Sequence, residues 1–149
     1  MYKRMLVPVD GSVRSEVVVR HAAETAKAFG CSIRLVTVVD LDKHNDKLTH
    51  DSPSDEAASL AWAESQMEEA ENHLRPVAAR LEDEGLKPEM EMRFGNPPAE
   101  ILKAAAEYGT DIIAMATRSR HGVARLMFGS VADQVLRGSH VPVLLITAA

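Results

Sequence analysis

Strand-like and helix-like segments alternate along the chain, and this order constrains the fold more than any other feature. Five short apolar runs carry the strand pattern, over residues 4–9, 33–39, 90–94, 111–116 and 141–147. Helical patterns separate them, over residues 12–29, 60–81 and 97–108 and from residue 130 onward. Such alternation favours one sheet of parallel strands with helices on both faces. The sequence therefore predicts an α/β protein with a five-stranded parallel sheet.

Capping and turn residues mark the ends of these segments. Ser12 and Asn96 stand where side chains cap helix starts, while Gly30 and Gly109 stand where helices stop. Pro76 lies inside the second helical pattern and predicts a bend there. Residues 40–55 are polar and lack periodicity, and residues 117–128 are basic, so both stretches are predicted to be loops.

Composition excludes several classes of protein. A formal charge of −5 argues against a sequence-tolerant nucleic-acid binder, which carries a basic surplus. Cys31 is the single cysteine, so no intrachain disulfide can form; a buried core residue is the favoured role and a reactive thiol the alternative. No run approaches the roughly 20 apolar residues of a membrane span, and no leader precedes the first strand. We expect a cytoplasmic protein without membrane or nucleic-acid partners.

Two predicted loops lie where an open parallel sheet binds ligands, beyond the carboxyl ends of its strands. The first contains Asp10, whose carboxylate would reach a bound ribose or base; the alternative is a turn or helix cap. The second offers cations and the start of a helix, which suit phosphate. Its residues of interest are Arg118, Arg120, Arg125, Gly129 and Ser130. A solvated loop and simple helix-start punctuation are the alternatives, and nucleotide binding is the leading hypothesis.

Signatures of other chemistry are missing from the sequence. Neither a P-loop nor the dinucleotide fingerprint after the first strand is present, and no serine stands in a nucleophile elbow. The loop over residues 40–55 holds histidines and aspartates without the fixed spacing of metal ligands. These candidates are Asp42, His44, Asp46, His50 and Asp51. The sequence thus predicts neither catalysis nor a metal site.

Three segments resemble those of a known family. They are Arg-Met-Leu-Val-Pro-Val-Asp-Gly-Ser over residues 4–12, Gly-Asn-Pro-Pro-Ala-Glu-Ile over 95–101, and Gly-Ser-Val-Ala-Asp-Gln-Val-Leu over 129–136 followed by the last strand. In this order they resemble the universal stress proteins over essentially the whole chain. The resemblance implies one domain over residues 1–149 with a doubly wound, Rossmann-like sheet of the adenine-nucleotide alpha hydrolase-like type, strand order 3-2-1-4-5.

The resemblance also implies a ligand site for ATP or AMP, with Mg²⁺ as an accompanying ion if the ligand is ATP. Nucleotide-binding members carry Gly-x₂-Gly-x₉-Gly followed by Ser or Thr; here Ala116 and Ser119 replace the first two glycines, and Gly129 with Ser130 match. Carried over by position, the adenine and ribose contacts are Pro8, Val9, Asp10 and Val38. The phosphate contacts are Met115, Ala116, Ser119, Gly129, Ser130, Val131 and Ala132. Arg118 and Arg120 are added from their charge and position.

The function implied is that of a stress-response sensor or regulator that binds an adenine nucleotide and is not an enzyme. Members that this chain resembles form homodimers through the last strand, here Val141 to Thr147, and an exposed apolar sheet edge favours the same pairing. One alternative is a family member that has lost its nucleotide and serves as a protein-interaction module. A small nucleotide-activating enzyme on the same plan is the other.

Overall fold

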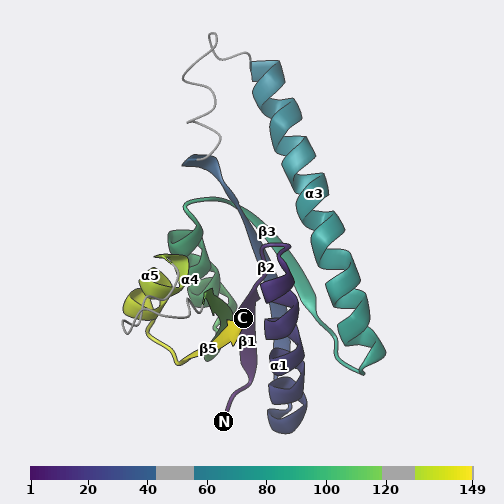
Figure 1. Cartoon of the computed structure of the whole chain (residues 1–149), viewed down its shortest axis with the longest axis vertical. Coiled ribbons are helices and arrows are strands. Elements are labelled where there is room, and N and C mark those ends of the chain that lie inside the picture. The colour runs from purple at the N-terminus through teal and green to yellow at the C-terminus, as the bar shows by residue number, and fades with distance from the viewer. Residues whose placement is uncertain (43–55, 119–129, 149) are drawn as a thin grey trace.

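The computed structural model describes residues 1–42, 56–118 and 130–148, and a five-stranded parallel sheet forms its centre (Figure 1). The strand order is β3-β2-β1-β4-β5, as expected. The strands are β1 (Arg4–Pro8), β2 (Ser32–Asp40), β3 (Glu89–Gly95), β4 (Ile112–Arg118) and β5 (Val143–Ala148). The winding reverses between β1 and β4, so the carboxyl ends of these two strands mark the switch point where doubly wound sheets bind ligands.

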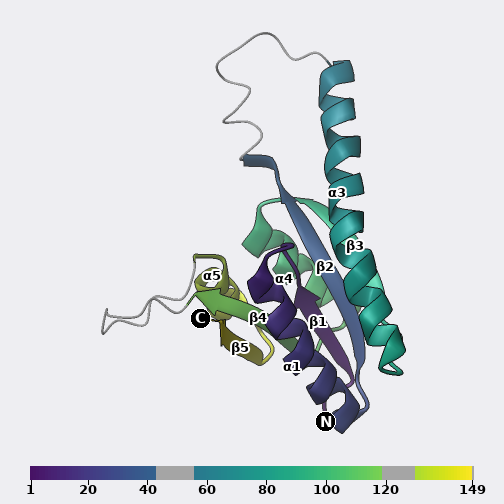
Figure 2. The same ribbon diagram turned by 45° about the vertical axis from the view of Figure 1, so that its right-hand side comes forward.

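Helices cover both faces of the sheet (Figures 1 and 2). Those described are α1 (Val13–Phe29), α3 (Glu56–Asp83), α4 (Pro97–Tyr108) and α5 (Ser130–Gly138). Helices α1 and α3 share one core cluster with the sheet, around Val7, Leu35 and Leu74, and α4 and α5 share a second cluster on the opposite face. The predicted two-sided arrangement is confirmed.

Local signals set the helix ends as the sequence predicts. The Ser12 side chain accepts a hydrogen bond from the Ser15 amide, and Asn96 Oδ1 accepts one from the Ala99 amide at 3.2 Å. Gly30 and Gly109 end α1 and α4 in the left-handed conformation that glycine adopts without strain. Pro76 lies inside α3, which continues on both sides of it.

Several predicted boundaries are wrong. Strand β4 runs to Arg118, so Thr117 and Arg118 belong to the strand and not to the basic loop. Strand β5 begins at Val143, two residues later than predicted, because the Val141 amide and carbonyl both bond the Ser139 hydroxyl in a turn. The rest of the basic loop and residues 43–55 of the polar loop lie outside the described residues.

Cys31 is 4% exposed and belongs to the core cluster under α1, as predicted. Burial raises the pKa of its thiol above the ordinary value. A thiol with a raised pKa is largely protonated near neutral pH, which disfavours the reactive alternative.

Helix α3 rests on the sheet over only part of its length. Its buried residues, Ala70, Leu74, Ala78 and Leu81, all lie in its second half. The first turns extend beyond the ends of the strands (Figure 2). In the first half of α3, Leu60 is 62% exposed although its spacing continues the apolar stripe of the buried residues.

Candidate functional site

The turn after β1 holds Asp10 in a fixed position at the switch point. Asp10 Oδ1 accepts hydrogen bonds from the Ser15 hydroxyl at 2.6 Å and from the Ser12 amide at 2.9 Å. The Asp10 amide in turn donates to the Ser15 hydroxyl at 3.1 Å. Every hydrogen bond that the described residues give this carboxylate goes to Oδ1. Oδ2 is therefore the oxygen that can accept from a ligand.

The same contacts keep this carboxylate ionised. Partial removal from water raises the pKa of Asp10, but the hydrogen bonds from Ser12 and Ser15 outweigh that effect and hold the pKa below its ordinary value. The turn therefore presents a negative charge and an open acceptor at neutral pH. The predicted alternative of a turn-holding role also describes these contacts, and both roles use the same residue.

Gly11 allows α3 to pack closely against this turn. Its φ is +80°, in the left-handed region, and a Cβ built on it would lie 2.6 Å from Nδ1 of His73 on α3. Any larger residue would therefore be strained by its backbone and would collide with the imidazole. The missing side chain brings α3 beside the end of β1.

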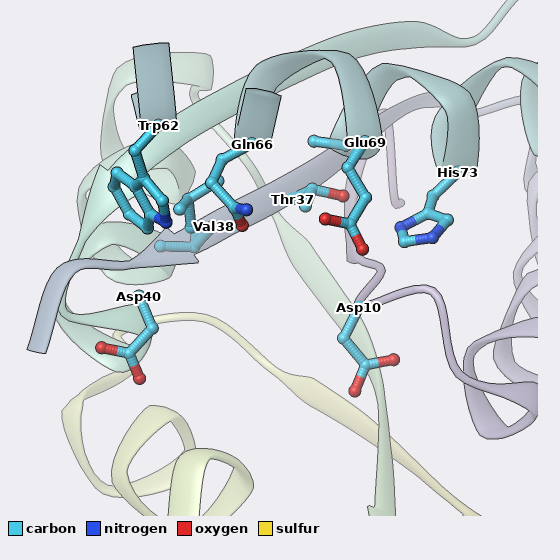
Figure 3. A pocket seen from close by; sticks show the side chains of 10 residues that line it. Asp10, Thr37, Val38, Asp40, Trp62, Gln66, Glu69 and His73 are labelled. Carbon is cyan, nitrogen blue, oxygen red and sulfur yellow. The ribbon is translucent and has the colours of Figure 1, made fainter. Parts of the chain in front are cut away.

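A pocket of about 340 Å³ lies between α3 and the carboxyl ends of β1 and β2 (Figure 3). The Thr37 hydroxyl fixes its floor by donating a hydrogen bond to the Val9 carbonyl at 2.7 Å, which joins the ends of the two strands. The residues that line the pocket are Asp10, Thr37, Val38, Val39, Asp40, Trp62, Gln66, Glu69, Ala70 and His73.

The pocket is rich in hydrogen-bond acceptors and negative charge. Asp10, Asp40 and Glu69 contribute carboxylates, and no lysine or arginine of the described ranges lines it. Glu69 forms no ion pair within residues 56–118, in contrast to the nearby Glu71, which pairs with Arg75. These carboxylates disfavour an anion in the pocket and favour a ligand group that brings hydrogen-bond donors.

A buried hydroxyl lies at the end of β4. Thr117 is 3% exposed, and its Oγ1 has no hydrogen-bond partner in the described part of the chain. Unpaired buried hydroxyls are uncommon and call for a bound group or water.

The described residues offer no metal site: residues 1–42, 56–118 and 130–148 hold no group of three His, Cys, Asp or Glu side chains suited to a metal ion. Of the loop candidates only Asp42 is described.

A sequence profile of the Universal stress protein family matches residues 1–147. The chain belongs to this family. A universal stress protein of Methanocaldococcus jannaschii, MJ0531, is 32% identical over 146 residues, covering 98% of this chain and 82% of that protein. The solved structure of MJ0577 matches with a TM-score of 0.84 and 28% sequence identity, and the match covers 100% of this chain and 98% of the MJ0577 chain.

A third relative has been solved with a ligand. It is the universal stress protein of Archaeoglobus fulgidus in complex with dAMP, at 25% identity and a TM-score of 0.67, covering 97% of this chain and 98% of that one. In this chain, no helix within the described ranges is both long and apolar enough to cross a membrane.

The structure of this universal stress protein places the residues predicted for adenine and ribose around the ends of β1 and β2. Asp10 and Val38 line the pocket, while Pro8 is half-buried at the last position of β1. Val9 is 4% exposed and its side chain belongs to the core under α1. Only the backbone of Val9 can therefore face a ligand.

The residues predicted for phosphate are divided between the sheet and α5. Met115 and Ala132 are buried together in the core under α4 and α5, and Val131 packs against that cluster. The side chain of Val38, a residue predicted for adenine and ribose, packs against the same cluster. The others described are Ala116 in β4, Arg118 at its end and the exposed Ser130, the first residue of α5. Ser119, Arg120, Arg125 and Gly129 lie outside the described residues.

Helix α3 contributes pocket residues that the sequence patterns did not predict. Trp62, Gln66, Glu69 and His73 all line the pocket and none was a predicted site residue. Their spacing of four, three and four residues places them on one helix face, and that regularity is the signal that could have found them. A polar helix face is usually solvated, so the pattern alone does not separate the two roles.

Proposed function

We propose that this universal stress protein binds an adenine nucleotide and acts as a stress-response regulator without catalytic turnover. The observation that carries the proposal is the pocket at the switch point, with the ionised carboxylate of Asp10 at its edge. Ribose hydroxyls and the adenine amino group are donors, and carboxylates accept from both. The dAMP complex of the Archaeoglobus fulgidus relative supports a ligand of this class.

The phosphate end of the ligand belongs on the other side of Asp10, toward β4 and α5. The Thr117 hydroxyl, which has no hydrogen-bond partner among the described residues, and Ser130, the first residue of α5, lie at that end of the fold. A helix start favours anions because its amide groups and dipole point outward. We propose ATP or AMP as the ligand, with Mg²⁺ accompanying ATP, and with Arg118, Ser119, Arg120 and Gly129 near the phosphates.

Calorimetry on protein freed of bound nucleotide by unfolding and refolding tests this function. We expect saturable heat with AMP or ATP, and mass spectrometry should detect adenine nucleotide copurifying with the untreated protein. Inorganic phosphate alone serves as the control for binding by charge. Absence of heat with every adenine nucleotide, together with absence of copurifying nucleotide, would contradict the proposal.

That outcome would favour a second function, a protein-interaction module that has lost its nucleotide. One structural observation supports it: Ala116, which replaces a family glycine, packs its side chain against the core under α1. A methyl group there limits how closely backbone amides approach a phosphate.

We also propose that two copies pair through β5, which forms one edge of the sheet. Its apolar residues Val143, Leu144 and Leu145 are only partly buried, and such an edge offers unpaired backbone groups to a second strand. Replacing Leu144 with lysine is expected to yield monomers by light scattering. Because Leu144 also contacts the core, circular dichroism must show that the variant is folded; a folded variant that stays dimeric would rule out this interface.

A further inference from the structure

One face of α3 forms a wall of the pocket that is separate from the helix stripe packed on the sheet. Trp62, Gln66, Glu69 and His73 project from it toward the ends of β1 and β2, as Figure 3 shows. The Glu69 carboxylate is directed toward the side of the pocket where Asp10 lies (Figure 3). Along successive turns of α3, the wall therefore presents an aromatic ring first and hydrogen-bonding side chains after it.

The charge of this wall determines which part of a nucleotide can enter. Glu69 adds a carboxylate opposite Asp10 and Asp40. Arg14 acts electrostatically on Asp10 from outside the pocket, but no lysine or arginine of the described ranges is among the lining residues. A phosphate brought among them would be repelled, whereas a nucleoside offers hydroxyl and amino donors together with a flat ring. The ring matches the indole, and the donors match the carboxylates.

We propose that this face of α3 is the nucleoside-selecting wall of the site. The proposal rests on the function proposed above and adds specificity-determining residues to it. The base lies against the Trp62 ring. Gln66 and Glu69 accept hydrogen bonds from the donors of the nucleoside, and the phosphates stay outside the pocket, on the side of β4. Gly11 makes this possible by letting His73 bring the wall against the turn of Asp10.

Trp62 is the only tryptophan of the chain, so its fluorescence reports on this wall directly. With excitation at about 295 nm, adenosine and AMP are expected to change the Trp62 emission along a saturable curve. Inorganic pyrophosphate, which carries the charge without the nucleoside, is expected to leave the emission unchanged. An emission change with pyrophosphate equal to that with AMP would overturn the proposed orientation.

A matched pair of substitutions tests Glu69. Glu69→Gln is expected to weaken adenosine and AMP equally, by about tenfold, because a charge-assisted hydrogen bond becomes a neutral one. Glu68→Gln makes the same chemical change one residue away, at an exposed position outside the pocket lining, and should leave both affinities unchanged. Both positions are exposed, so circular dichroism should show two folded variants.

Two results would separate the failure of this inference from that of the proposed function. If calorimetry shows AMP binding while Trp62 emission and the Glu69→Gln affinities do not change, the nucleotide binds elsewhere and α3 is not the wall. If wild-type protein gives no heat with any adenine nucleotide, the proposed function fails and the inference fails with it. Equal weakening by Glu68→Gln and Glu69→Gln would point to general charge and also overturn the role of Glu69.

Discussion

Changing Asp10 to asparagine is expected to lower the affinity for adenosine and AMP by about tenfold to a hundredfold. Asparagine keeps one acceptor oxygen for Ser12 and Ser15, so the turn should stay folded, but the negative charge and the second acceptor are lost. Calorimetry with both ligands measures the effect. Asp83→Asn, at the far end of α3, makes the same change away from the pocket and should be silent.

An equal loss for adenosine and AMP would assign Asp10 to the nucleoside. A loss for AMP alone would place the carboxylate near the phosphate and contradict our orientation. If the variant lowers thermal stability but binds both ligands as wild type does, Asp10 only holds the turn.

The depressed pKa of Asp10 gives the same substitution a pH signature. The charged form is favoured in the folded protein, so its contribution to stability is present above the ordinary value of 3.8 and disappears as pH falls through the depressed pKa. The difference in the free energy of unfolding between wild type and Asp10→Asn should therefore stay constant from neutral pH down to about the ordinary value of 3.8. At lower pH this difference should become smaller.

Shortening Leu74 to alanine is expected to cost about 2–5 kcal/mol of folding free energy, because a cavity would replace a fully buried side chain. Leu74 is 0% exposed and joins α3 to the sheet core. Urea unfolding at fixed temperature measures the loss. Leu60→Ala provides the matched control, with the same chemistry on the same helix at 62% exposure, and should cost about 0.5 kcal/mol or less. Similar losses for both would show that the two halves of α3 contribute equally.

Local signals were sufficient for most of the fold. Ser12, Gly30, Asn96 and Gly109 set helix ends because capping depends on a few neighbouring residues. Strand ends depended on distant partners instead. Thr117 and its neighbour Arg118 extend β4 because they pair with Thr147 and Ala148 of β5, thirty residues further along the chain. No neighbouring residue carries that information.

The candidate site likewise has one part that local sequence predicts and one part that depends on distant contacts. The position of Asp10 follows from a strand that ends in a turn, so the sequence predicts it. The wall on α3 depends on how the helix is rotated about its axis against the sheet, which the contacts of Leu74 and Ala78 determine. From periodicity alone, Gln66 and Glu69 read as an ordinary solvated face.

The extension of α3 beyond the strands divides the molecule into regions of unequal local stability. Amides near Leu74 and Leu81 lie beside buried core residues, whereas within the described part of α3 the turns around Leu60 contribute no residue to the buried core. The cooperative unit of folding therefore ends inside a helix. Trp62 and Gln66 lie in the first half of α3, outside the buried core. A ligand bound against them would order these turns together with the core, so ligand binding and the helical order of this half would be thermodynamically linked.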